Sequence, residues 1–354
     1  MSNDRHAIRF TYLSQEDLLQ ADCLDFRLAI DAAESALLAY RNGDVLFPEK
    51  IVQIFNPETQ ERINCLPATL RRERVCGMKW VSVFPSNVSA FGVQNLAALM
   101  VLSEIEKGFP FAVMEGTLAS NVRVGTISAL ATRYFAPEES RIIGFIGSGE
   151  QAKMNLLAMK SVRPGLTECR VSAKTVEEER QFVRELAPIL TDMDLISAGT
   201  DSAWAMSEAD ILVTATSAQA PLLQAAWMKP GSFYSHVGGW EDEYAVAKQC
   251  EKIVCDDWET VKHRTQTLSR MYADGELSDA DISGNLVEFV AGDKPARKRE
   301  DERVYFNAVG LAYVDVAISL AMFRRAVEAG KGQQLTMQET MLFDHPRVAD
   351  HIRL

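Results

Sequence analysis

The amino-acid sequence predicts an α/β protein with two domains, one of them built around a doubly wound parallel sheet. Strand and helix patterns alternate from residue 141 to residue 328, whereas short β-rich runs occupy residues 47–115. A chain of 354 residues normally forms about two domains. With 47% hydrophobic and 24% charged residues, the composition is that of a globular protein and excludes disordered and disulfide-stapled classes.

The first region is predicted to be an α+β domain. Apolar residues at one-sided helical spacing predict a helix over residues 25–43. Strands are predicted over residues 51–55, 77–83, 98–103 and 111–115, the last two joined by the turn sequence Glu106–Pro110. These runs favour a mostly antiparallel sheet, and a further helix is expected over residues 118–134.

From residue 141 the chain alternates between strands and helices, which is typical of βαβ units and of a parallel sheet covered on both faces. We predict strands over residues 141–146, 168–172, 210–215, 233–237, 252–256 and 303–307, and helices over residues 150–160, 175–187, 258–273 and 309–328. The doubly wound domain is therefore placed at residues 131–305. Residues 306–354 are expected to return to the first domain, residues 1–130.

A glycine-rich turn follows the first of these strands. An apolar strand precedes the glycines and a helix follows them, as in the G-x-G-x-x-G/A dinucleotide fingerprint of Rossmann-type domains. In that fingerprint the first glycine permits a tight turn, the second lets the backbone approach the pyrophosphate, and the helix N-terminus attracts the anion. The alternative is a merely structural turn. The candidate cofactor-binding residues here are Gly147, Ser148, Gly149, Glu150, Gln151 and Ala152.

The end of the next strand bears on the choice between NAD and NADP. An NAD enzyme usually places an acid there against the ribose 2′-hydroxyl. This strand ends instead in Ser172, followed by Lys174, with no acid before Glu177. A hydroxyl and a lysine suit a 2′-phosphate, so the sequence favours NADP over NAD. The alternative is that Lys174 is a solvated residue at a helix start.

Two basic residues in apolar surroundings are candidate ligands of a substrate. Lys79 lies in an apolar strand, where it needs a carboxylate partner or acquires a shifted pKa suited to proton transfer. Arg123 lies near the start of an apolar helix, and its fork matches a carboxylate. Each can also be read as a member of a structural ion pair.

Six motifs in order along nearly the whole chain resemble the ornithine cyclodeaminase/μ-crystallin family. They are Val113–Gly116, Arg123–Ala129, Gly147–Ala152, Ala209–Thr216, Val237–Gly239 and Gly310–Asp315. The resemblance implies an NAD(P)-dependent oxidoreductase that transfers hydride between nicotinamide C4 and Cα of an amino or imino acid. It also implies a homodimer joined through the N-terminal sheet, which makes that region a substrate-binding and dimerisation domain.

The resemblance also assigns roles to individual residues. Lys79 matches the family's active-site lysine and Arg123 its carboxylate-binding arginine. Asn95 occupies a position often held by threonine, and Lys50 stands where many members have a second arginine, which keeps the charge but loses the bidentate fork. Further implied cofactor contacts are Thr126, Ser172, Lys174, Thr214, Ala215, Thr216, Gly238 and Gly310.

The sequence departs from the family pattern after Val237–Gly239. Cyclodeaminase-type members continue with an aspartate, whereas this chain has Trp240, a candidate wall of the substrate pocket, followed by Glu241 and Asp242. Either a shift of one or two residues lets Glu241 or Asp242 act as the general base, or the acid is absent. The change favours an imino-acid reductase or amino-acid dehydrogenase over cyclisation with ammonia loss. The alternatives are a cyclodeaminase, a siderophore-pathway dehydrogenase that splits N-(2-amino-2-carboxyethyl)-glutamate, and a non-catalytic crystallin-like binding protein.

Several classes of partner are not expected. The net charge of −12 disfavours nucleic acid, and Gly310 and Asp315 interrupt the longest apolar run, Phe306–Phe323, which reads as a buried helix and not a membrane span. The segment Met1–Phe10 lacks the features of a secretory signal, and the six cysteines have no metal-ligand spacing. We therefore expect a cytoplasmic enzyme without a metal. Among the histidines, His236 is either a proton relay or a structural residue.

Overall fold

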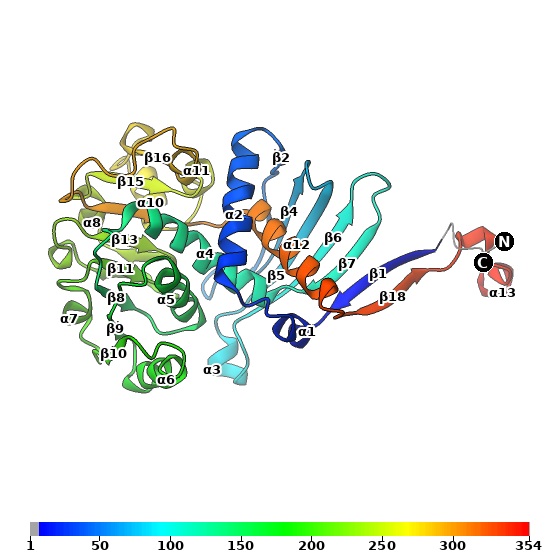
Figure 1. Ribbon diagram of the computed structural model, residues 1–354, viewed down its shortest axis with the longest axis horizontal. Coiled ribbons are helices and arrows are strands. Elements are labelled where there is room, and N and C mark those ends of the chain that lie inside the picture. Colours follow the sequence, from blue (N-terminus) through cyan, green and yellow to red (C-terminus); the bar gives the residue numbers. More distant parts are fainter. Residues whose placement is uncertain (1–6, 354) are drawn as a thin grey trace. The chain divides into compact units, whose positions relative to one another are not determined.

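The computed structural model describes residues 7–353 and divides into two compact units (Figure 1). Unit 1 comprises the chain up to Asp25, Gly43–Ser120 and the chain from Asp315 onward, and unit 2 comprises Phe26–Asn42 and Asn121–Val314. The sequence-based division instead assigned residues 26–42, 121–130 and 306–314 to the first domain, and its functional assignment stays a prediction. Residues 1–6 of the N-terminal segment interpreted above lie outside the described residues.

Unit 1 is built on an eight-stranded sheet with the order β18-β1-β7-β6-β5-β4-β2, and β3 also pairs with β4. All pairs are antiparallel except β1 with β7. The strands are β1 (Ile8–Leu13), β2 (Val45–Leu46), β3 (Ile51–Asn56), β4 (Glu61–Leu70), β5 (Val75–Val83), β6 (Leu96–Glu104), β7 (Pro110–Glu115) and β18 (Gln333–Gln338). The short helices are α1 (Gln15–Gln20), α3 (Asn87–Phe91) and α13 (Val348–His351), with a 3-10 turn η3 (Leu342–Asp344). The mostly antiparallel sheet matches the expectation.

Helix α12 (Ala312–Glu328) packs closely on this sheet. A Cβ added to Gly77 of β5 would lie 2.6 Å from a methyl group of Val316, so only glycine allows helix and strand to approach this closely.

Strand β4 was not predicted from the sequence, because Glu61, Arg62 and Pro67 obscure its alternation, yet its register with β5 is continuous. Strand β1 meets β7 only over Thr11–Leu13, and the rest of the β1–β18 ribbon runs past that strand (Figure 1).

Unit 2 is built on an eight-stranded parallel sheet with the order β10-β9-β8-β11-β13-β17-β15-β16. The strands are β8 (Ile142–Ile146), β9 (Glu168–Ser172), β10 (Asp194–Ser197), β11 (Ile211–Thr214), β13 (Phe233–His236), β15 (Lys252–Cys255), β16 (Gly284–Asn285) and β17 (Val304–Asn307). The chain winds outward from β8 in one direction and then returns to β11 on its other side. This reversal is the topological switch point at which such sheets bind ligands.

Helices cover both faces of this sheet. They are α2 (Phe26–Arg41), α4 (Thr117–Phe135, which begins in unit 1), α5 (Glu150–Val162), α6 (Val176–Leu186), α7 (Ser202–Met206), α8 (Tyr244–Lys248), α9 (Trp258–Val261), α10 (Thr267–Ala273) and α11 (Leu286–Val290). On one face Phe145 contacts Phe182 of α6 and Phe233 stacks on Phe135 of α4. On the other, Tyr234 belongs to a core cluster with Val246 of α8 and Leu268 of α10. The doubly wound prediction is confirmed.

Two sequence-based elements need correction. The helix expected over residues 258–273 is two helices, α9 and α10, because the chain turns between them and Gln266, the residue before the second, has an extended backbone. The apolar run Phe306–Phe323 is not one helix, since it contains the end of β17, a loop and the start of α12. Among the described residues, no helix is long and apolar enough to cross a membrane. Smaller elements include the parallel pair β12 (Gln219–Leu223) and β14 (Trp240–Asp242), and the 3-10 turns η1 (Ala225–Trp227) and η2 (Asp279–Asp281).

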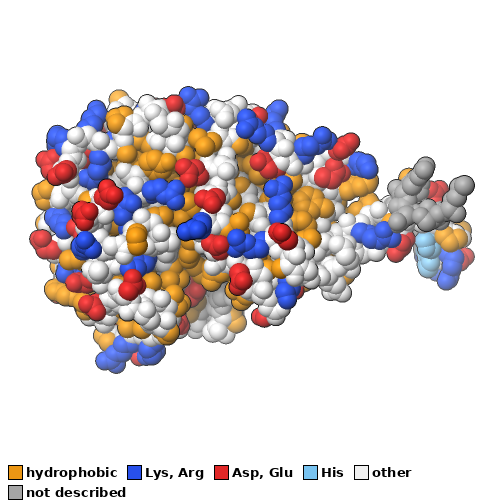
Figure 2. All heavy atoms as spheres, viewed as in Figure 1, with side chains coloured by type: hydrophobic (Ala, Val, Ile, Leu, Met, Phe, Trp, Pro, Cys, Tyr) orange, Lys and Arg blue, Asp and Glu red, His pale blue; other side chains and the backbone are white. Residues whose placement is uncertain are grey.

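Acidic and basic side chains are mixed over the surface. On the face shown in Figure 2, Lys and Arg lie among Asp and Glu and do not gather in one area of a single sign. All six cysteines are free thiols, three of them buried. The excess of acidic residues therefore does not mark a site on this face.

Candidate functional site

The glycine turn of unit 2 lies between β8 and α5, beside the switch point. Gly147 has φ +105°, and a Cβ there would lie 2.4 Å from the Ala215 carbonyl oxygen at the end of β11. Its amide donates to the Ser172 carbonyl at 2.8 Å, which ties the turn to β9. Gly149 is the N-cap of α5 and has open space around its missing Cβ. A rigid turn followed by an uncovered helix N-terminus is the arrangement that suits a pyrophosphate.

The remaining residues of the turn divide between surface and core. The Gln151 side chain donates to the Asn121 side chain at 2.7 Å, while Glu150 is exposed and Ala152 is fully buried. Behind the turn, a Cβ on Gly125 of α4 would lie 2.6 Å from the Met154 carbonyl oxygen of α5. Thr126 beside it is fully buried, so close packing of α4 on α5 holds the turn from behind.

The end of β9 carries no free acid. The Ser172 hydroxyl lies 2.8 Å from the Ser202 hydroxyl, and Lys174 is exposed. The nearest buried acid, Glu179, accepts from the amides of Ala173 and Gly199 at 3.2 and 2.9 Å and also binds the Ser197 hydroxyl. Its carboxylate therefore holds the loops after β9 and β10 together and does not point outward as a ligand.

Glu241 joins the ends of β11 and β13. Its carboxylate is fully buried and accepts from the Thr214 hydroxyl, the Thr216 amide and hydroxyl, and the Gly238 amide, at 2.5 to 2.8 Å. A Cβ on Gly238 would lie 2.5 Å from this carboxylate, so the glycine is needed for the contact. Burial raises the pKa of Glu241, and these four donors oppose the rise. Three of the residues predicted as cofactor contacts, Thr214, Thr216 and Gly238, are therefore held together by the carboxylate of Glu241, and Ala215 lies between the two threonines in the chain.

Asp242 lies in a second buried cluster. It accepts from the hydroxyls of Thr267 at 2.6 Å, Tyr305 at 3.0 Å and Tyr234 at 3.3 Å, and the His236 ring nitrogen lies 3.5 Å away. Burial raises the pKa of Asp242 to about 7 and lowers that of His236 to about 4. His236 is accordingly neutral near pH 7. In place of the general-base role expected for Glu241 or Asp242, full burial and these hydrogen bonds favour a structural role for both.

Trp240 takes the position next to these acids and is partly exposed. The guanidinium of Arg270 lies 4.4 Å from its ring centre, a cation–π contact that orients the indole. Trp240 therefore presents an apolar surface at the place where the family pattern has an aspartate.

Arg123 and Gly310 meet in unit 2. Gly310 has φ +94°, and a Cβ there would lie 2.7 to 3.0 Å from the guanidinium atoms of Arg123. The guanidinium is therefore packed against the bare Cα of this glycine, and the Arg123 side chain is 9% exposed. The sequence predicted Gly310 as a cofactor contact. In the structure it contacts Arg123, the residue predicted to bind the substrate carboxylate.

Lys79, Lys50 and Asn95 lie in unit 1. The Lys79 ammonium, 2% exposed, donates to Asp315 of α12 at 2.7 Å and to the Ser120 hydroxyl of α4 at 3.2 Å. Lys50 precedes β3 and is half-buried, and Asn95 precedes β6 with a buried side-chain oxygen. Asp315 was not among the predicted site residues. Its signal in the sequence was a single acid in an otherwise apolar run.

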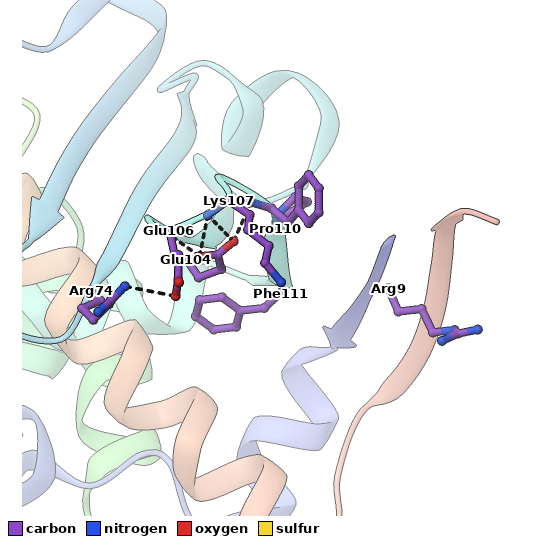
Figure 3. A pocket seen from close by; sticks show the side chains of 8 residues that line it. Arg9, Arg74, Glu104, Glu106, Lys107, Pro110 and Phe111 are labelled. Carbon is purple, nitrogen blue, oxygen red and sulfur yellow. Dashed lines mark hydrogen bonds and ion pairs between the residues drawn. The ribbon is translucent and has the colours of Figure 1, made fainter. Parts of the chain in front are cut away.

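A surface hollow of about 430 Å³ lies elsewhere in unit 1, at the β6–β7 turn (Figure 3). Its lining includes Arg9, Arg74, Glu106 and Phe111, and the Arg74 guanidinium lies 3.1 Å from the Glu106 carboxylate. None of the predicted site residues lines it. It is therefore not part of the candidate site.

Comparison with known proteins agrees with this geometry. A model of the ornithine cyclodeaminase/mu-crystallin family matches residues 13–330. Alanine dehydrogenase of Archaeoglobus fulgidus is 30% identical over 328 residues, which are 91% of this chain and 97% of that protein. The solved structure of Thermococcus litoralis Delta(1)-pyrroline-2-carboxylate reductase with NADH and L-proline matches with a TM-score of 0.86 and 28% identity, over 92% of this chain and 99% of that chain. An archaeal alanine dehydrogenase dimer with bound NAD matches with a TM-score of 0.85 and 27% identity, over 94% of this chain and 100% of that chain.

Proposed function

The chain belongs to the ornithine cyclodeaminase/mu-crystallin family, and from this premise we propose that it is a nicotinamide-dependent imino-acid reductase or amino-acid dehydrogenase. The observation that carries the choice within the family is the environment of residues 240–242. Trp240 replaces the cyclodeaminase aspartate, and the carboxylates of Glu241 and Asp242 are fully buried among donors of unit 2. Without an available acid at this place, deprotonation of a substrate amine for cyclisation is disfavoured.

The residues of unit 2 fit a nicotinamide dinucleotide. We assign the pyrophosphate to the turn Gly147–Gly149 and the N-terminus of α5, because these offer backbone amides and open space beside a switch point. When bound there, the nicotinamide supplies hydride exchange with the substrate Cα. Relatives with solved structures bind NADH and NAD. Our preference for NADP rests on Lys174, which is exposed after β9, and on Glu179, whose carboxylate is occupied by loop amides.

The substrate contacts are assigned residue by residue. Arg123, packed flat against Gly310, would bind the substrate carboxylate through its fork, and Lys50 would add a second positive charge. Lys79, held by Asp315 and Ser120, would stabilise that carboxylate or carry the amine proton. Trp240 would limit the size of the substrate side chain that the site accepts. Glu241 would keep the Thr214–Thr216 and Gly238 loops in place for the cofactor.

The deciding experiment is a substrate panel. L-Alanine, L-proline, L-ornithine and N-(2-amino-2-carboxyethyl)-glutamate are each mixed with NAD⁺ or NADP⁺, and the corresponding imino or keto acids, with ammonium where needed, are mixed with NADH or NADPH. We expect net change in reduced-nicotinamide absorbance with at least one pair. Ammonia release from L-ornithine without net reduction would instead identify a cyclodeaminase. Cofactor binding without turnover of any compound, together with no effect of Lys79→Ala, would indicate a binding protein and overturn the proposal.

We also propose that the enzyme is a homodimer joined through the unit 1 sheet. The face of the unit 1 sheet opposite α12 carries apolar side chains that stay exposed among the described residues: Trp80 of β5 lies between Cys65 of β4 and Leu99 of β6 in the strand register. Trp80 and Leu99 are 43% and 40% exposed, and Ile51 and Phe55 of β3 are 61% and 57% exposed. A patch of this kind marks an interaction surface. A dimeric relative makes a second copy of the chain the favoured occupant.

A further inference from the structure

We infer that Asp256 is a positioning residue for substrate binding: it holds Val309 and Gly310 in the backbone conformation against which the Arg123 guanidinium packs. This inference rests on the proposed function, in which Arg123 binds the substrate carboxylate. Asp256 lies at the end of β15, far in sequence from both partners, and no motif in the sequence marks it.

The hydrogen bonds of Asp256 are directed at one loop. One carboxylate oxygen accepts from the consecutive amides of Val309 at 2.9 Å and Gly310 at 2.8 Å, and the other accepts from the Asp257 amide at 2.8 Å. The backbone amide of Asp256 donates to the Asn307 carbonyl at 3.0 Å. The side chain is 2% exposed. A buried carboxylate with three amide donors is a strong and directional anchor.

The backbone of the anchored loop is tightly constrained at Gly310. Its φ of +94° is strained for any residue with a side chain, and the space where a Cβ would stand is filled by Arg123. If the two amides were released, the loop would relax, and the surface supporting the guanidinium would move with it. Because a bidentate carboxylate contact depends on the orientation of a planar fork, such a movement weakens substrate binding without removing the arginine.

Gln266 braces the same loop from a second side. Its side-chain amide donates to the Ala308 carbonyl at 3.0 Å and to the Gly238 carbonyl at 2.9 Å, and its oxygen accepts from Asn307 at 2.8 Å. Residues 307–310 are therefore fixed by two buried side chains, Asp256 and Gln266. Of these two side chains, Asp256 is the one that accepts from the amide of Gly310 itself.

The test compares Asp256→Asn with a matched control at the opposite end of the sheet. Asp210 also accepts two consecutive amides through one oxygen, from Arg141 at 2.7 Å and Ile142 at 2.9 Å. We expect Asp256→Asn to raise the KM of the amino or imino acid found in the substrate panel by about tenfold, the worth of a charge-assisted hydrogen bond, with cofactor Kd unchanged. Asp210→Asn should lower the melting temperature but leave both constants unchanged. Equal KM effects of the two substitutions, or no KM effect of Asp256→Asn, would overturn the inference.

Two further variants separate positioning from general destabilisation. Gly310→Ala should raise the same KM, whereas Gly275→Ala, at φ +73° with open space, carries comparable backbone strain and should not. Arg123→Lys alone tests the proposed function: if it leaves KM unchanged, the assignment of Arg123 is wrong, and with it this inference. If Arg123→Lys raises KM, the double variant Asp256→Asn/Arg123→Lys should bind substrate little worse than Arg123→Lys, because Asp256 acts through the arginine. Additive losses would contradict the inference while leaving the role of Arg123 intact.

Discussion

Lys79 and Asp315 form a buried ion pair, with the ammonium 2.7 Å from the carboxylate and the two side chains 2% and 1% exposed. Strand β5 supplies the lysine and helix α12 supplies the acid, and Gly77 allows that helix to lie close to the strand. A buried pair of this kind is costly to desolvate and is weak evidence for stability. Its retention in an apolar environment agrees better with a role in chemistry.

Lys79→Ala should therefore abolish turnover and also destabilise the fold. Removing one partner of a buried ion pair costs about 3–5 kcal/mol. Lys79→Met/Asp315→Leu, which removes both charges, should recover much of the stability but none of the activity. Melting temperatures and kcat/KM measured on the three proteins check this. Full activity in the double variant would show that the pair is only structural.

Gly149→Ala should weaken cofactor binding without affecting stability. The residue has an ordinary φ of −73° and nothing within 4 Å of the added methyl group. The methyl group would, however, keep the pyrophosphate from the helix N-terminus, so we expect the dinucleotide Kd to rise by about tenfold or more. Gly165→Ala, whose nearest neighbour is at 3.5 Å outside the turn, is the control. Quenching of tryptophan fluorescence by the cofactor measures the dinucleotide Kd of both variants. Unchanged binding by Gly149→Ala would contradict the assigned pyrophosphate site.

Lys174→Ala should lower the preference for NADPH. An exposed lysine paired with a phosphate contributes little more than an exposed ion pair, so the expected rise in KM for NADPH is about two- to fivefold, with KM for NADH unchanged. The difference between the effects of Lys174→Ala on the KM for NADPH and on the KM for NADH should shrink as salt is added. Lys298→Ala, another exposed lysine of unit 2, serves as the control. Equal effects on both cofactors would remove the argument for NADP.

Asp242 should make stability depend on pH. Burial raises its pKa in the folded protein to about 7, above the value of 3.8 expected when unfolded. A raised folded pKa contributes stability that is fully present below the unfolded pKa and is lost as pH rises through about 7. The difference in unfolding free energy between the wild type and Asp242→Asn should therefore shift against the wild type between pH 5 and pH 8 by about 1–3 kcal/mol. Urea titrations at several pH values measure it, and a constant difference would show that Asp242 does not titrate in this range.

Trp80→Asp should convert the enzyme to a monomer. A charge placed in the apolar face of the unit 1 sheet cannot be buried against a second copy without a partner. Ile189→Asp, at a 61% exposed position of unit 2, should have no such effect. Light scattering on size-exclusion peaks distinguishes the two. A dimer that survives Trp80→Asp would place the interface elsewhere.

The local elements could be read from the sequence because periodicity and turn chemistry are local. The Gly147–Ala152 turn, the strands around it and the helix Phe26–Arg41 are specified by neighbours a few residues apart. Strand β4 and the break between α9 and α10 were not readable in this way, because pairing with β5 and the hydrogen bonds of Gln266 to Gly238, Ala308 and Asn307 come from distant segments.

The sequence by itself determined the family and the doubly wound domain, and it predicted the cofactor turn and the binding of an anionic substrate by a lysine and an arginine, since residue types and spacing carry that information. Only the tertiary structure decided which acidic side chains are buried and which donors they bind. Glu241 and Asp242 directly follow Trp240 in the sequence, yet both carboxylates face inward to donors on β11, β13 and α10. Asp315, which interrupts an apolar run, supports Lys79, and Asp256, which no motif marks, supports the loop that packs against Arg123. The physical reason is that a carboxylate's role depends on burial and on donors brought from distant segments, and these exist only once the chain has folded.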